Sequence, residues 1–214
     1  LEMFRDMDVP TPMVRAMKQM SSQSERMTCL VNDLIELSKL ESASSERSRE
    51  PFNLGLLCQQ VISEMKGFSD NAKVHFTSAN NNDFIIEGFE TEMHSVLTNL
   101  MTNGIKYGSN EEIFVALSTS ERGIKVTIKD KGQGIPPQHL TRLTERFYRV
   151  DESRESAVGG SGLGLAIVQR TATLLEHSIA LESLPGRGST FSVRIEQANI
   201  DDCIVYMDAA PESL

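Results

Sequence analysis

Four short segments in the middle and later parts of the chain carry the residues best suited to chemistry. They cover residues 99–107, 130–135, 146–151 and 160–165, in that order. Each segment alone is a weak signal, because amides, carboxylates and glycines occur on every protein surface. Their order and spacing are hard to produce by chance, so we interpret them as parts of one site.

The first segment places Asn99, Asn103 and Lys106 at positions i, i+4 and i+7. In a helix this spacing puts the three side chains on one face. An amide oxygen is a hard ligand of the kind that Mg²⁺ takes, and a lysine one turn further on can meet a phosphate. The alternative interpretation is an ordinary solvated polar stripe.

The second segment begins with Asp130 at the expected end of a strand and continues through Gly132 and Gly134. Glycines allow the backbone to turn sharply and to approach a flat ligand closely. A half-buried carboxylate at this point can accept a hydrogen bond from an exocyclic amine such as that of adenine. The alternative is a simple Asp-Gly turn.

The fourth segment carries Gly160, Gly162 and Gly164 at the start of a helix expected from Leu163 onwards. Backbone N–H groups at a helix start, with the helix dipole behind them, form an anion site. The G-x-G-x-G spacing is not the dinucleotide-binding fingerprint, and the chain contains no Gly-Lys dipeptide for a P-loop. We therefore expect a polyphosphate site of a different class.

The third segment is followed by a charged stretch, residues 149–155, which leads to the glycines. Arg149 is placed to reach phosphate oxygens. A lid that orders over a bound nucleotide fits this composition, and the alternative is a disordered surface loop. Together the four segments predict a pocket for ATP and Mg²⁺.

The elements that must position these segments follow from hydrophobic periodicity. It predicts helices at 54–65, 90–107 and 163–175, and strands at 74–76, 84–86, 113–117, 124–128, 179–181 and 190–195. Asn53 is the expected N-cap of the first of these helices. Helices on one face of a mixed, largely antiparallel sheet make an α+β two-layer sandwich.

A long helix is expected ahead of this sandwich. Its apolar residues recur in steps of three and four, at Met13, Met17, Met20, Met27, Val31 and Leu34. A single narrow stripe cannot be buried by one helix alone, which favours a helical hairpin that dimerises into a bundle. The alternative is a helix packed on the rest of its own chain. The methionines indicate an adaptable seam rather than a cofactor site.

Composition limits the remaining possibilities. The formal charge of −9 disfavours non-specific nucleic-acid binding, and no segment offers the roughly 20 apolar residues of a membrane span. Cys29, Cys58 and Cys203 have neither metal-ligand spacing nor a plausible disulfide framework. Because the chain starts at Leu1, we expect it to be a fragment of a longer protein. We divide it into a partial helical domain (1–41), a polar linker (42–51), a second domain (52–197) and an acidic, loosely ordered tail (198–214).

The four segments in this order resemble the catalytic ATP-binding domain of bacterial sensor histidine kinases, a branch of the gyrase, Hsp90, histidine kinase and MutL superfamily. Residues 99–107 resemble the N box, 130–135 the first glycine box, 146–151 the F box and 160–165 the second glycine box. Residues 186–191 are similar to a last, weaker glycine motif. The resemblance covers about 52–197, implies the sandwich known as the Bergerat fold, and is strongest to phosphate-regulon sensor kinases. Residues 24–41 resemble the second helix of the family's dimerisation and phosphotransfer domain.

The resemblance also implies roles for individual residues. Asn103 would bind Mg²⁺; Lys106, Arg149 and the backbone around Gly162 and Gly164 would hold phosphates. Tyr107 would pack near adenine, and Asp130 would accept the adenine amino group with help from Gly134 and Thr190. The remaining nucleotide-binding positions implied by the motifs are Gly132, Ile135, Phe147, Gly160 and Leu163.

Position 99 separates the chemistries within the superfamily. Its ATPases carry a glutamate four residues before the Mg²⁺-binding asparagine, and that glutamate activates water. This chain has Asn99 there, and an amide cannot act as a general base. We therefore expect slow hydrolysis and transfer of the γ-phosphate to a protein histidine, with Asn99, Lys106 and Arg149 as the catalytic residues.

The chain departs from the family in one respect. The family's phosphoacceptor histidine lies in a His-Glu-Leu-Arg-Thr-Pro-like segment, and none is present: the histidines are His75, His94, His139 and His177. We expect that this chain binds ATP but cannot phosphorylate itself or dephosphorylate a partner. The alternatives are a superfamily ATPase, or a non-catalytic module that only dimerises and docks a regulator.

The resemblance implies partners as well. It implies a response regulator protein and a homodimer formed through the N-terminal helices. It further implies that this is the cytoplasmic portion of a membrane-anchored, inner-membrane sensor.

Overall fold

The computed structural model describes residues 11–42, 48–69, 71–79, 84–108, 112–120, 123–150 and 161–196. The helices are α1 (Thr11–Ser42), α2 (Leu54–Phe68), α3 (Glu90–Tyr107), α4 (Pro137–Leu140) and α6 (Gly164–Leu174). The strands are β1 (Glu50–Asn53), β2 (Lys73–Ser78), β3 (Ile85–Gly88), β4 (Glu112–Ser120), β5 (Gly123–Asp130), β6 (Ser178–Leu184) and β7 (Gly188–Glu196). Each helix and strand expected from periodicity is present in this part of the chain.

The main sheet has five strands in the order β2-β4-β5-β7-β6. Only β2 and β4 run parallel; the other neighbours are antiparallel, as the sequence predicted. The predicted hairpin is formed by β4 and β5. Strands β1 and β3 pair separately, with Pro51 opposite Glu87, so the last residues of the predicted linker are strand instead.

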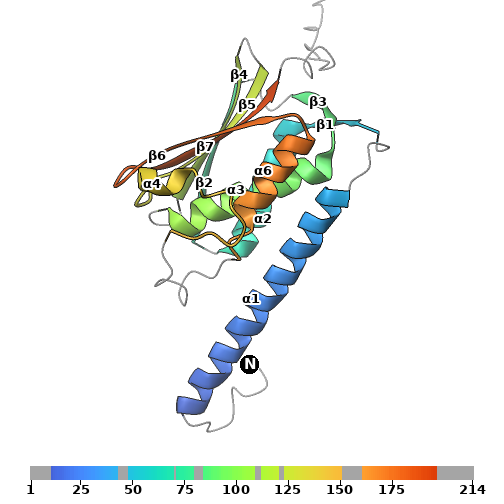
Figure 1. The fold of residues 1–214 in the computed structure, drawn as a ribbon. Coiled ribbons are helices and arrows are strands. Elements are labelled where there is room, and N and C mark those ends of the chain that lie inside the picture. Colours follow the sequence, from blue (N-terminus) through green and yellow to red (C-terminus); the bar gives the residue numbers. More distant parts are fainter. Residues whose placement is uncertain are drawn as a thin grey trace, which may run out of the picture.

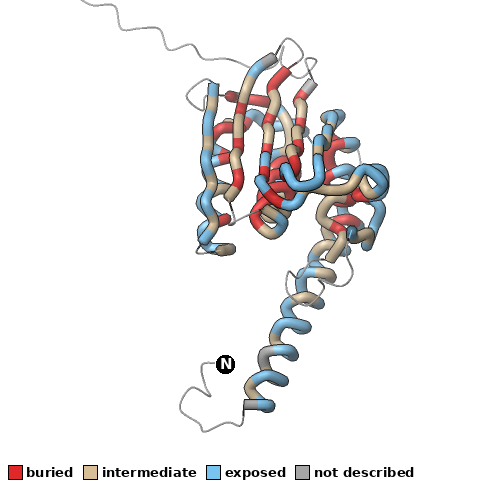
Figure 2. The backbone as a smooth tube through the Cα atoms, turned by 90° about the vertical axis from the view of Figure 1, so that its left-hand side faces the viewer, coloured by how far each residue is buried: buried red, intermediate tan, exposed pale blue. Residues whose placement is uncertain are grey.

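The sheet is covered on one face by helices α2, α3 and α6, which makes two layers (Figure 1). Strand β5 shows why: Ile124, Val126 and Ile128 are buried and alternate with more exposed residues. Helix α3 supplies the other half of the core, and its Leu97 and Leu100 are fully buried. The red segments in Figure 2 therefore lie between the layers. The predicted α+β sandwich is confirmed.

Local capping fixes where α2 begins. The side chain of Asn53 accepts a hydrogen bond from the Leu56 backbone N–H at 3.0 Å, as the sequence predicted. Burial raises the pKa of the Cys58 thiol in this helix to about 12. Cys58 is therefore a core residue, and its thiol is not a nucleophile.

Helix α1 extends well beyond the sandwich, and most of it is exposed (Figures 1 and 2). Its C-terminal part packs on the chain: Leu37 and Leu40 form a small buried cluster with Leu163 and Ile167. The expected helix is confirmed, and part of it packs on its own chain. Met13, Met20 and Met27 stay 57%, 71% and 66% exposed, so the bundle remains a prediction.

Within the described residues, no helix combines the length and the hydropathy that crossing a bilayer requires.

Candidate functional site

The helix start of the fourth segment lies against the helical face of the first. A β-carbon added to Gly164 would stand 2.7 Å from Asn99 Oδ1 and 3.9 Å from Asn103 Nδ2. Both predicted amides therefore lie beside the N-terminus of α6, on one face of α3. The α6 N-terminus, with its unpaired N–H groups and positive dipole end, suits an anion there.

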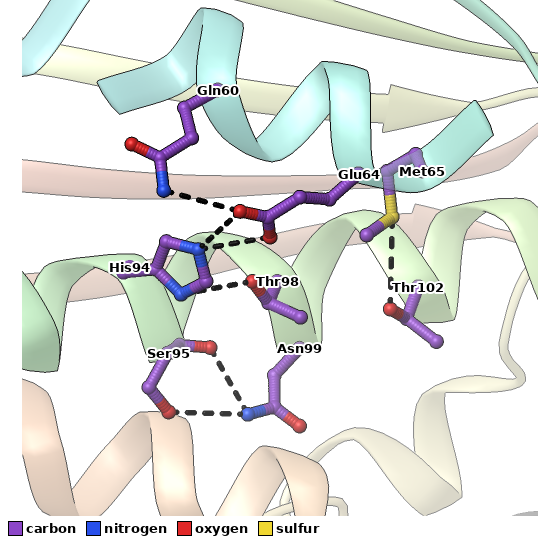
Figure 3. A network of polar contacts seen from close by, with 8 residues as sticks. All are labelled: Gln60, Glu64, Met65, His94, Ser95, Thr98, Asn99 and Thr102. Atoms are coloured by element: carbon purple, nitrogen blue, oxygen red, sulfur yellow. Dashed lines mark hydrogen bonds and ion pairs between the residues drawn. The ribbon is translucent and has the colours of Figure 1, made fainter. Parts of the chain in front are cut away.

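The amide of Asn99 is held in a defined orientation. Its Nδ2 donates to the Ser95 carbonyl oxygen at 3.0 Å and contacts Ser95 Oγ at 3.4 Å (Figure 3). Because both contacts use the nitrogen, the amide oxygen turns toward Gly164. Figure 3 also shows the opposite face of α3, where His94 meets the Glu64 carboxylate of α2 at 2.9 Å. The hydrogen bond from His94 lowers the pKa of Glu64.

Asp130, at the end of β5, is buried and anchored by the backbone. Its Oδ1 accepts from the Gly132 N–H at 2.7 Å and from the Ser189 N–H at 3.2 Å. Burial raises the pKa of Asp130, and the bonds from Gly132 and Ser189 oppose that rise. A carboxylate has about four lone-pair sites, so it can still accept from an amine.

The hydroxyl next to Asp130 belongs to Ser189, which the sequence analysis did not single out, whereas the resemblance implied a role for Thr190. Ser189 is buried and its side chain bonds to Asp130. Ser189 lies on the same face of β7 as Phe191, Val193 and Ile195, which are also buried, so it faces the helices. Thr190 has the other parity and lies on the opposite face of β7. The apolar alternation of β7 was the signal that distinguishes the two residues.

The second segment is closely packed against its neighbours. Gly134 has φ of +68°, and a β-carbon there would meet the Leu184 carbonyl oxygen at 2.0 Å, so only glycine fits. A β-carbon on Gly132 would likewise stand 2.0 Å from the Tyr107 carbonyl oxygen. The Ile135 N–H donates to Ser183 Oγ at 2.8 Å. These contacts join the loop after Asp130 to the end of α3 and to the β6–β7 turn.

The third and fourth segments are joined in the same way. The Phe147 N–H donates to the Gly162 carbonyl oxygen at 2.9 Å. Phe147 has φ of 65°, which is uncommon for a residue with a side chain, and the residue is 57% exposed. The buried Leu163 follows, with its N–H bonded to Ser161 Oγ at 3.0 Å.

Lys106, in the last turn of α3, lies under the electrostatic influence of a second cation, Arg149. Burial lowers the pKa of Lys106, and the charge of Arg149 lowers it further, which places the two side chains near one another. Asp33 and Cys29 of α1 act on Lys106 in the opposite direction. Two cationic side chains near one another favour the binding of a polyanion.

The structure thus brings most of the predicted residues together around one end of α3. Tyr107 is at that end and is 47% exposed. Gly160 and Asp151 lie outside the described residues, as does most of the predicted lid. Among the described residues, no group of three or more His, Cys, Asp and Glu side chains is arranged to hold a metal. An amide oxygen such as that of Asn103 is a hard ligand of the kind that Mg²⁺ takes.

Comparison with known proteins gives the same picture. Residues 88–199 match the family described as histidine kinase-, DNA gyrase B- and HSP90-like ATPase. The chain is 38% identical over 196 residues to the phosphate regulon sensor protein PhoR of Pseudomonas aeruginosa, covering 90% of this chain and 44% of that protein. The chain therefore spans less than half of that relative's length.

Solved structures share the fold. The histidine kinase AdeS of Acinetobacter baumannii has a TM-score of 0.67 at 21% identity, covering 92% of this chain and 90% of that one. Full-length ShkA in complex with AMPPNP has a TM-score of 0.68 at 24% identity, covering 80% of this chain and 36% of that one. Likeness at this level of identity concerns the fold alone.

Proposed function

The chain belongs to the histidine kinase-, DNA gyrase B- and HSP90-like ATPases and contains the ATP-binding catalytic domain of a sensor histidine kinase. From this premise we propose that it binds Mg²⁺·ATP and delivers the γ-phosphate to a protein histidine. The phosphohistidine then passes its phosphate to a response regulator. The helix α1 contributes to a homodimer of the longer, membrane-anchored protein.

The observation that carries this proposal is the buried Asp130. Its carboxylate is fixed by the N–H groups of Gly132 and Ser189 at the end of β5. A buried carboxylate with rigid backbone donors on one oxygen is prepared to accept one further donor in a fixed direction. The exocyclic amine of adenine supplies that donor. Tyr107 and Ile135, next to this loop, would pack near the base.

The phosphates are assigned to the other end of the site. The N-terminus of α6 and the cations Lys106 and Arg149 would neutralise them. Gly162 and Gly164 would allow close backbone approach. Asn103 would hold the Mg²⁺, which would neutralise phosphate charge. The donor set fits this ion, because the amide lies beside the α6 N-terminus where phosphates would collect.

Asn99 supports transfer rather than hydrolysis. Its amide nitrogen is bonded to Ser95 and its oxygen faces Gly164, so no basic group stands at this position to activate water. The main work left to the chain is positioning and charge neutralisation. Steady, rapid phosphate release from ATP would instead favour the superfamily ATPase.

We infer that none of the four histidines of the chain is the acceptor, because none lies in a His-Glu-Leu-Arg-Thr-Pro-like segment. His75 and His94 are bonded to Glu112 and Glu64, and helix α1 carries no histidine. We therefore propose that this chain alone does not form phosphohistidine.

The experiment is a transfer assay in trans. The chain is incubated with labelled Mg²⁺·ATP, alone and with an added helical domain that carries a His-Glu-Leu-Arg-Thr-Pro-like segment. We expect acid-labile label on the added domain and none on the chain. Stable, acid-labile label on the chain alone would refute the proposal for the acceptor, and label on neither would refute transfer.

A further inference from the structure

One face of the last part of α1 lies against the site. Asp33, Glu36, Leu37, Leu40 and Glu41 are spaced i, i+3, i+4, i+7 and i+8, which places them together on one side of the helix. The two leucines pack in the cluster with Leu163 and Ile167. The three carboxylates interact with three different parts of the site. The charge of Asp33 acts on Lys106, Glu36 accepts a hydrogen bond from Ser95, and Glu41 accepts one from Arg146.

The contact between Glu36 and Ser95 differs from the others because it continues into the site. Ser95 Oγ donates a hydrogen bond to Glu36 Oε1, across 59 residues of sequence. An ionised carboxylate only accepts hydrogen bonds, so the hydroxyl proton must point to Glu36. The lone pairs of Ser95 Oγ are then directed to other donors. One such donor is Asn99 Nδ2, at 3.4 Å (Figure 3).

This arrangement determines which way the Asn99 amide faces. With the nitrogen toward Ser95, it meets two acceptors, the carbonyl oxygen and Oγ. The reversed amide would bring its oxygen against both of them, which is unfavourable. When Glu36 is withdrawn, the Ser95 hydroxyl can turn and donate to Asn99 itself, and the preference for one orientation weakens. The docked helix thus reinforces the orientation with the oxygen beside Gly164.

We propose that Ser95 is a positioning residue that couples the docking of helix α1, through Glu36, to the orientation of the Asn99 amide at the nucleotide site. This inference rests on the proposed function. Docked α1 keeps the site in its binding geometry and raises its affinity for Mg²⁺·nucleotide. Because coupling between two equilibria is reciprocal, bound nucleotide strengthens the docking of α1 by the same factor.

The other interactions of this helix face, including the effect of the Asp33 charge on Lys106, do not involve the Asn99 amide. Leu37 and Leu40 hold α1 on the α6 surface, and Glu41 pairs with Arg146 on the exposed side. Neither contact reaches the Asn99 amide. These contacts should keep α1 docked when the Glu36–Ser95 bond alone is removed, so that the effect of that bond on nucleotide binding can be measured separately.

The test is a double-mutant cycle on Mg²⁺·ADP affinity, measured by calorimetry on the full chain. Its variants are Glu36→Ala, Ser95→Ala and the double variant. Ser95→Thr restores the hydroxyl, and Glu25→Ala is the matched control, since Glu25 of α1 bonds only within its helix, to Ser21, in the contacts described. We expect a roughly fivefold loss of affinity in each single variant, no further loss in the double variant, and recovery with Ser95→Thr.

A second readout excludes a merely structural effect. Hydrogen exchange of the amides in residues 34–41 is measured with and without Mg²⁺·ADP. Nucleotide should slow this exchange in the parent and in Glu25→Ala, and much less in Ser95→Ala. Losses that multiply in the double variant, or variants that bind like the parent, overturn this inference alone. A folded parent that does not bind Mg²⁺·ADP overturns the proposed function together with it.

Discussion

Gly164 and Asn99 lie so close that a β-carbon on the glycine would stand 2.7 Å from the amide oxygen of the asparagine. The two residues come from different segments, one opening α6 and the other in the middle of α3. Their contact joins the expected phosphate-binding turn to the helical face that carries Asn103. A change at either residue should therefore be felt at the nucleotide.

Gly164→Ala should weaken Mg²⁺·ADP binding roughly tenfold, because overpacking at a tight contact costs about 1–3 kcal/mol. The matched control is Gly67→Ala in α2, where nothing lies within 4 Å of the added carbon. Calorimetric titration of the two variants checks the prediction. Equal affinity in both would show that this contact has no bearing on the nucleotide.

Ser189→Ala should lower ADP affinity about tenfold, because a hydrogen bond to a charged group contributes about 1.5–3 kcal/mol. Thr190→Val, on the opposite face of β7, should change it little. The comparison decides which hydroxyl assists Asp130, and a larger effect at Thr190 would contradict the structural assignment.

Asp130 should give opposite pH trends for binding and for stability. Since its pKa is raised above the ordinary 3.8, the folded chain holds this proton more tightly than the unfolded chain does. Its contribution to the free energy of unfolding is present at low pH and falls as pH rises through the raised pKa. ADP affinity instead rises over the same range, because the ionised carboxylate is the better acceptor.

Titrations and unfolding curves between pH 4 and 7 check both trends, roughly spanning the range of shifted carboxyl groups. Asp130→Asn has no titrating group at this position, so it should lose this pH dependence of both ADP affinity and the free energy of unfolding. If the variant keeps the pH dependence of ADP affinity, another group is responsible.

Lys106 should limit binding at alkaline pH. Burial and Arg149 lower its pKa, so it loses its charge at lower pH than an ordinary lysine. ADP affinity should then decline as pH rises through this lowered pKa. Lys106→Arg should abolish the decline, since arginine stays protonated. An unchanged alkaline profile in Lys106→Arg would exclude Lys106 as the phosphate-binding cation.

Local patterns were sufficient to predict most of the fold. Helix α3 was predicted with its observed bounds, because its apolar spacing is regular, and the β4–β5 hairpin followed from two alternating runs with a short turn. The pairing of β1 with β3 was not predictable, since it joins segments that lie far apart in the sequence. The contact between Glu36 and Ser95 was not predictable for the same reason, since the two residues are 59 positions apart in the sequence.

The site was predicted by residue type and less well by geometry. The amides of Asn99 and Asn103 share a face because helical spacing requires it. The structure places Ser189 rather than Thr190 beside Asp130, because a strand reverses its face at every residue and a shift of one position moves a side chain across the sheet. The pairing of Lys106 with Arg149 depends on tertiary packing, which spacing cannot show.

The most direct test of the central claim is a calorimetric titration of the chain with ADP and Mg²⁺, repeated on Asp130→Ala. Glu182→Ala, an exposed carboxylate on β6, is the control. We predict binding by the parent and the control and near-total loss in Asp130→Ala. A folded parent that does not bind, or an Asp130→Ala variant that binds as tightly as the parent, would contradict the account.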